Sequence, residues 1–130
     1  MSVRIVRLGT SRLPHEGLRI GTVRRPPRGI PKSEFAARDF YDVWLPELAP
    51  SEGLVKQAFR ARDARSWKAF VRRYRAEMKR PAAARLIALL AALSSHAAFS
   101  VGCYCEDASR CHRSVLAALL REGGARFASN

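Results

Sequence analysis

The stretch from Ala98 to Leu120 constrains the fold more than any other part of the chain. It opens with an apolar run, Phe99 to Tyr104, that contains β-branched and aromatic residues, and it closes with aliphatic residues at helical spacing. Polar residues from Glu106 to Arg110 separate the two patterns. A short apolar run, a polar segment and an amphipathic pattern in this order predict a strand, a loop and a helix.

The rest of the chain supplies neighbours for this strand and helix. Val3 to Leu8 and Leu18 to Val23 both have the composition of strands. Three helical patterns lie between them and the last strand, and these begin near Ser51, Trp67 and Pro81. Strands at both ends with helices between them predict a single α/β domain over residues 1–130. Its sheet is expected to be small, mainly parallel and flanked by helices.

A glycine in one predicted strand and three aromatic residues in one predicted helix lead to further expectations. Gly21 lies inside the second predicted strand, where a glycine marks a bulge or a close approach of another group. The aromatic residues Trp67, Phe70 and Tyr74 follow helical spacing, and we interpret them as core residues and not as a platform for stacking bases.

The predicted topology also indicates where a ligand-binding site would lie. In parallel α/β sheets, ligands bind beyond the carboxyl ends of the strands. Three loops follow the three predicted strands: Gly9 to Arg12, Arg24 to Lys32, and Glu106 to Arg113. We therefore expect these three loops to meet at one edge of the sheet.

The charge of the chain indicates the class of partner. It has 24 Lys and Arg residues against 11 Asp and Glu, which gives a formal net charge of +13. Such an excess attracts polyanions, so nucleic acid is one candidate partner. The basic residues are dispersed along the whole sequence, however, and a solvated basic surface explains the same numbers.

Composition and sequence pattern also indicate the cellular location of the protein. No apolar run approaches the roughly 18–20 residues that a transmembrane helix needs. Arginines interrupt the stretch from Met1 to Leu13, which argues against a signal peptide there. The chain has three cysteines, an odd number, which favours reduced thiols over a disulfide framework. We therefore expect a cytoplasmic protein without a membrane partner.

The loop from Arg24 to Lys32 has a composition suited to anion binding. It contains three prolines and one glycine, which exclude a helix or a central strand, and four basic side chains that no acidic residue offsets before Glu34. Guanidinium groups on a stiff loop bind phosphate or carboxylate at a low ordering cost. A plain solvated loop is the alternative interpretation.

The segment around Cys111 and His112 admits four interpretations. The first is an anion site, in which the free N–H groups at the start of the last helix act with Arg110 and Arg113. The second is a nucleophilic cysteine, because a helix N-terminus and a neighbouring Arg favour the thiolate. The phosphatase spacing, with five residues between Cys and Arg, is absent here.

The third interpretation is a metal site formed by Cys103, Cys105, Cys111 and His112. The spacing of these four residues differs from the paired C-x2-C motifs of zinc knuckles. The positive charge of the nearby arginines also disfavours a bound cation. The fourth is purely structural, with buried cysteines and a helix-capping histidine. We assign Cys103, inside the apolar run, to the core, and we expect Asp107 or Ser109 to cap the last helix.

Taken in order, these motifs resemble the YeaO-like proteins of the domain-of-unknown-function family 488. The similarity covers about Leu18 to Leu120. Its marks are the Arg24–Lys32 loop, Trp44-Leu45 with Ala49-Pro50-Ser51, the Trp67-Phe70-Arg73-Tyr74 helix, and Cys103-Tyr104-Cys105-Glu106 leading to Cys111-His112-Arg113. Where family members carry Val-Asp-Arg-Leu-Trp-Pro-Arg-Gly, this chain has Thr22 to Gly29 without the Asp and the Trp. The resemblance implies a fold but no particular chemistry.

These observations lead to one functional hypothesis and one alternative. We expect a basic pocket that binds a phosphorylated or nucleotide-like anion through Arg24, Arg28, Arg110, Arg113 and Ser11. If the protein is an enzyme, Cys111 or His112 is expected to carry the chemistry with Glu106 as a partner. No cofactor and no resident metal are expected. The alternative is a non-catalytic nucleic-acid-binding protein that uses its dispersed arginine surface.

Overall fold

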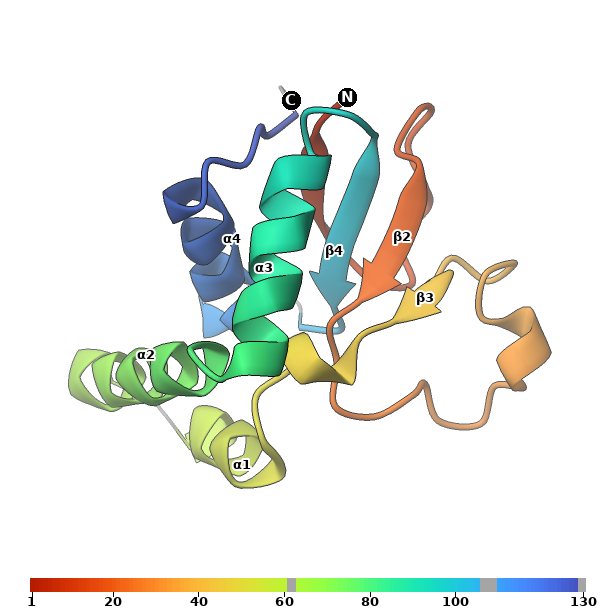
Figure 1. Ribbon diagram of the computed structural model, residues 1–130. Helices are drawn as coiled ribbons and strands as arrows, with labels where there is room; N and C mark the ends of the chain where they lie inside the picture. Colours follow the sequence, from red (N-terminus) through yellow and green to blue (C-terminus); the bar gives the residue numbers. More distant parts are fainter. Residues whose placement is uncertain (61–62, 106–109, 129–130) are drawn as a thin grey trace.

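The computed structural model has a four-stranded, entirely parallel sheet at its centre (Figure 1). It describes residues 1–60, 63–105 and 110–128. The strand order is β1-β4-β2-β3, with bounds β1 Val3–Arg7, β2 Leu18–Gly21, β3 Val43–Trp44 and β4 Phe99–Cys103. This confirms the predicted α/β class and the predicted parallel sheet. The two-residue edge strand β3 is an addition to the three strands that the sequence predicts.

Helices cover one face of this sheet (Figure 1). The described residues contain four α-helices, which are α1 Glu52–Arg60, α2 Ala64–Met78, α3 Pro81–Leu93 and α4 His112–Glu122. The main core joins the strand residues Phe99 and Val101 to apolar residues of the helices, among them Phe70, Tyr74 and Leu116. Phe70 and Tyr74 are 1% and 0% exposed, which confirms the core interpretation of the aromatic stripe.

The starts and ends of several elements differ from the sequence expectations. A single 3₁₀ turn, Lys32–Glu34, forms at the end of the proline-rich loop. Helix α1 begins directly after Ser51, but the Ser51 hydroxyl donates to Glu77 across 2.5 Å. Helix α4 has Cys111 at its N-cap and no side-chain cap. The predicted caps Asp107 and Ser109 lie outside the described residues.

The second face of the sheet is covered by non-helical chain. Successive residues of a strand point to opposite faces, so Gly21, next to the core residue Ile20, faces away from the helices. A Cβ at Gly21 would lie 2.3 Å from the ring of Tyr41, and this ring therefore packs directly against the strand. The close approach expected at Gly21 is confirmed. Tyr41 belongs to a second apolar cluster with Leu8, Val23, Phe35, Cys103 and Cys111.

A buried ion pair lies on the same face. Arg19 of β2 is 0% exposed, and its guanidinium donates to both carboxylate oxygens of Glu16, at 2.8 and 2.9 Å. The hydroxyl of Ser100 on β4 donates to the same carboxylate. Arg19 also donates to the backbone carbonyls of Thr10 and Asp39. This network ties β2 and β4 to the loops that cover the sheet.

The Glu16 carboxylate makes the stability of the protein depend on pH. Burial raises the pKa of Glu16, but the hydrogen bonds from Arg19 and Ser100 outweigh it, so the net pKa lies below the ordinary value of 4.5. A carboxyl whose pKa is lower in the folded state stabilises the protein above its unfolded pKa and loses that contribution as the pH falls. Urea unfolding at a series of pH values is expected to show a stability gap between wild type and Glu16→Gln that narrows below about pH 4.5.

The matched control for this measurement is Glu34→Gln, because Glu34 is exposed. Its gap to wild type is expected to be small at every pH. A gap for Glu16→Gln that stays constant from pH 7 to pH 3.5 would contradict this assignment.

None of the helices in the described ranges has the length and apolar character needed to cross a membrane.

Candidate functional site

A cavity of about 960 Å³ opens beyond the carboxyl ends of β2 and β4. Most of its lining comes from three separate segments, which are the loop after β2, helix α1, and the chain from the end of β4 to the start of α4. Two of the three loops predicted to meet, those beginning at Arg24 and ending at Arg113, therefore do meet. The first loop does not line the cavity, and its Arg12 pairs with Asp39 and Asp42 at 3.3 and 2.7 Å. Ser11 is exposed and does not line the cavity.

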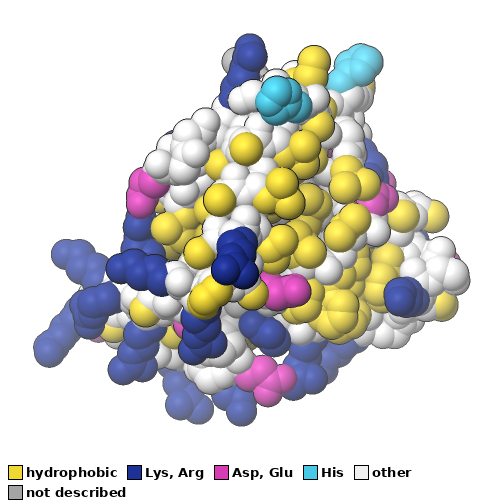
Figure 2. Space-filling view, in the orientation of Figure 1, with side chains coloured by type: hydrophobic (Ala, Val, Ile, Leu, Met, Phe, Trp, Pro, Cys, Tyr) yellow, Lys and Arg dark blue, Asp and Glu magenta, His cyan; other side chains and the backbone are white. Residues whose placement is uncertain are grey.

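Basic side chains line this cavity. Among the described residues around it, five are basic and Glu52 is the one acid; the basic ones are Arg24, Arg25, Arg28, Lys56 and Arg110. Figure 2 shows Lys and Arg side chains gathered over α1 and α2 at this end of the molecule. The remaining walls are largely apolar and include Val55, Phe59 and Tyr104. The lining therefore combines several basic side chains with largely apolar walls.

The individual arginines differ in how strongly they are held. Arg24 donates to the carbonyls of Pro50 and Ala49, each at 3.0 Å, so part of its guanidinium fixes the loop to the turn before α1. Arg25 pairs with Glu52. Arg110 lies 5.9 Å from the ring of Trp67 and donates to the carbonyl of Asp63. Arg28 is exposed at the cavity wall.

The three thiols of the chain gather at the inner end of the cavity. Cys103 ends β4 and Cys111 precedes α4, and their Sγ atoms are 2.6 Å apart. Both are buried, whereas Cys105 is exposed, and all three line the cavity. The assignment of Cys103 to the core is confirmed, because it is 1% exposed within the second apolar cluster, where its side chain also contacts the second thiol. Alternation along the strand agrees with this burial, since Cys103 shares its face with Val101.

Hydrogen bonding distributes the charge unequally among these thiols. Hydrogen bonds from Cys103 and Cys111 lower the pKa of Cys105, and the positive charge of nearby Arg113 lowers it further. The interaction with Cys105 raises the pKa of Cys103 to about 11. The pKa of Cys111 is raised by its hydrogen bonds to the other two thiols. The pKa of Cys105 is therefore lowered, whereas the pKa values of Cys103 and Cys111 are raised above that of an ordinary thiol.

His112 faces the thiols in a defined tautomer. Its Nε2 lies 2.7 Å from the carbonyl oxygen of Thr22, and its Nδ1 lies 3.7 Å from Cys111 Sγ. A carbonyl only accepts, so Nε2 carries the proton and Nδ1 presents its lone pair to the cysteines. Burial lowers the pKa of His112, which keeps the imidazole neutral. Its ring packs edge-on against Tyr74.

Arg113 has a different position from the one predicted. It is 5% exposed and is absent from the cavity wall, and its guanidinium donates to the carbonyl of Cys105 at 2.8 Å. Its Nε is buried without a hydrogen-bond partner. The guanidinium therefore lies behind the thiol cluster, where it acts on the charge of the cysteines.

One predicted residue cannot be placed, and several residues that line the cavity were not predicted from the sequence. Glu106, the predicted partner of the catalytic group, lies outside the described residues. Lys56, Phe59 and Phe70 line the cavity from α1 and α2, because these helices pack beneath the strand ends (Figure 1). Their spacing marks amphipathic helices but gives no sign of which sheet edge the helices cover.

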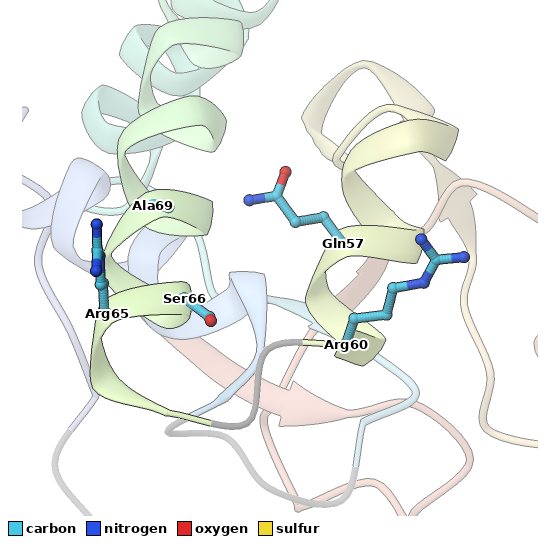
Figure 3. A pocket seen from close by; sticks show the side chains of 5 residues that line it. All are labelled: Gln57, Arg60, Arg65, Ser66 and Ala69. Carbon is cyan, nitrogen blue, oxygen red and sulfur yellow. The ribbon is translucent and has the colours of Figure 1, made fainter.

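A second, smaller hollow of about 270 Å³ lies between α1 and α2. Figure 3 shows the side chains of Arg60 and Arg65 on opposite sides of it, with that of Arg60 pointing outward from α1 and that of Arg65 running along α2. The amide oxygen of Gln57, at its rim, accepts a hydrogen bond from Arg73 at 2.6 Å. Its basic groups do not converge, so it lacks the geometry of an anion site.

Comparison with known proteins is informative at the level of the family. No curated protein and no solved structure matches the chain. The model of the family DUF488-N3a, described as the active DUF488-N3 subclade, matches residues 3–124. This match covers nearly all of the sequence and confirms the resemblance noted from its motifs. The chain belongs to the DUF488 family.

Proposed function

We propose that the cavity beyond β2 and β4 binds a small phosphorylated or nucleotide-like anion. The observation that carries this proposal is the convergence of basic side chains from three separate segments on one cavity, namely Arg28 from a loop, Lys56 from α1 and Arg110 from the chain before α4. A dispersed basic surface does not require such convergence. The volume of about 960 Å³ is in the range typical of small-molecule sites.

The start of helix α4 supports the same proposal. Cys111 and His112 line the cavity, and the helix has no side-chain cap. The first N–H groups of a helix and the positive end of its dipole attract anions. Apolar walls such as Phe59 and Tyr104 suit the sugar and base of a nucleotide better than they suit free phosphate.

Thermal unfolding with added ligand tests this proposal. The reduced full chain is heated with phosphate, ribose 5-phosphate and a panel of nucleoside phosphates. A ligand at a hundredfold excess over its Kd stabilises the folded state by about 2.7 kcal/mol, which corresponds to a rise in Tm of roughly 10 °C. In Arg28→Ala/Arg110→Ala this rise is expected to fall below about 3 °C.

The matched control is Arg72→Ala/Arg85→Ala, which removes the same charge from exposed positions on α2 and α3. Its ligand-induced rise is expected to equal that of wild type. An equal loss in both double variants would contradict the pocket. If oligonucleotide binding then fell steeply with salt, the alternative of nucleic-acid binding by the dispersed arginines would replace it.

A further inference from the structure

The buried cluster at the inner end of the cavity has the donor atoms of a metal site. The Sγ atoms of Cys103 and Cys111 and a ring nitrogen of His112 all lie within 4.8 Å of one another. Thiolate sulfur and imidazole nitrogen are the ligands that zinc takes in proteins. The end of a strand and the first turn of a helix hold them, so the backbone positions are fixed by the fold.

We propose that Cys103, Cys105, Cys111 and Nδ1 of His112 bind one zinc ion. The proposal goes beyond anion binding and does not depend on it. Zn–S bonds of about 2.3 Å separate tetrahedral ligand atoms by roughly 3.5–3.8 Å. The separation of Cys111 Sγ and His112 Nδ1, 3.7 Å, already has this value. The two buried Sγ atoms, at 2.6 Å, would open by about 1 Å on binding the ion.

The hydrogen bond to Thr22 prepares His112 for this role. Metal-binding histidines donate their second ring N–H to a carbonyl or carboxylate, which fixes the tautomer and the orientation of the ring. His112 Nε2 makes this contact with the Thr22 carbonyl at 2.7 Å. Its Nδ1 is thereby left as an acceptor directed at the thiols.

Charge balance assigns the fourth ligand. Zinc with two thiolates and a neutral histidine is uncharged, whereas a third thiolate gives the site one negative charge. Arg113 is buried behind the cluster and bonds to the carbonyl of Cys105. Among the described residues, no carboxylate forms an ion pair with it. A Cys₃His site compensates this buried guanidinium, and Cys105 is the remaining thiol at the cavity. The arginine that seemed to oppose a cation therefore favours the complete site.

Cobalt substitution tests the site directly. The full chain is reduced, stripped with a chelator and titrated with Co²⁺, a spectroscopic probe for tetrahedral zinc sites. One Co²⁺ per chain is expected, with sulfur-to-cobalt charge-transfer absorption that added zinc abolishes. In Cys105→Ser, which alters an exposed residue, the charge-transfer intensity is expected to drop by about one third and the affinity to fall more than roughly tenfold.

Tyr104→Phe is the control, because it changes the neighbouring side chain without removing a metal ligand. It is expected to bind Co²⁺ as wild type does. Failure of the reduced wild type to bind Co²⁺ while three thiols titrate would overturn the proposal. A Cys103–Cys111 disulfide that persists under reducing conditions, shown by one titratable thiol, would overturn it as well. An unchanged spectrum in Cys105→Ser would overturn the assignment of the fourth ligand.

Discussion

Replacement of Arg19 by methionine is expected to lower the free energy of unfolding by about 3–5 kcal/mol, because it leaves the Glu16 carboxylate buried without its partner. Glu16 is 2% exposed and receives two hydrogen bonds from Arg19. Methionine retains much of the volume of the side chain, so the loss comes mainly from the uncompensated charge and from the carbonyls that Arg19 satisfies. Urea unfolding of wild type and variant at pH 7 gives the difference.

A double-mutant cycle separates the charge effect from loss of packing. In Glu16→Gln/Arg19→Met the stranded carboxylate is gone, so the double variant is expected to be more stable than the sum of the two single effects predicts, by about 2 kcal/mol. Arg12→Met provides the comparison, because the Arg12–Asp42 pair is partly exposed and is expected to contribute about 1 kcal/mol or less. Strict additivity in the cycle, or equal losses in Arg12→Met and Arg19→Met, would contradict this account.

The buried Arg19 also shows where sequence reasoning about the fold ends. The strands and helices follow from patterns visible in the sequence, and the parallel sheet follows from their order. An arginine in a strand pattern predicts an exposed position. Arg19 is buried because Glu16, Thr10 and Asp39 surround it, and these contacts exist only once the loops have folded over the sheet. Gly21 predicted that another group would approach the strand closely, but nothing in the sequence identified this group as the ring of Tyr41.

Sequence reasoning likewise predicts one part of the candidate site and misses another. Its place at the carboxyl edge of the sheet, and the participation of Arg28, Cys111 and His112 in one cavity, could be predicted from strand order and loop composition. The direction of each side chain could not. Arg113 follows Cys111 by two residues, yet it is absent from the cavity wall and donates to the carbonyl of Cys105, while Cys103 contacts Cys111 from within the core. Such directions depend on how the first turn of α4 packs against the end of β4.

Gly17→Ala is expected to destabilise the protein by about 3 kcal/mol or more, because two independent costs coincide there. Gly17 has φ = +80°, and a Cβ at this position would lie 1.9 Å from the carbonyl oxygen of Ala98. Gly17 and Ala98 immediately precede β2 and β4, whose register begins with Leu18 beside Phe99. The clash is with backbone, so its relief requires the two central strands to separate where their pairing starts.

Gly124→Ala separates the two costs. Gly124 has φ = +89°, but a Cβ there meets nothing within 4 Å, so only the strain of the left-handed conformation remains, about 1 kcal/mol. Thermal and urea unfolding of both variants is expected to show the larger loss in Gly17→Ala, and similar losses would contradict the close packing of these strand starts. The cavity and thiol cluster lie at the opposite ends of the same strands. Folded Gly17→Ala is therefore expected to bind Co²⁺ and anions as wild type does, which makes the variant a test of whether the site depends on local geometry alone.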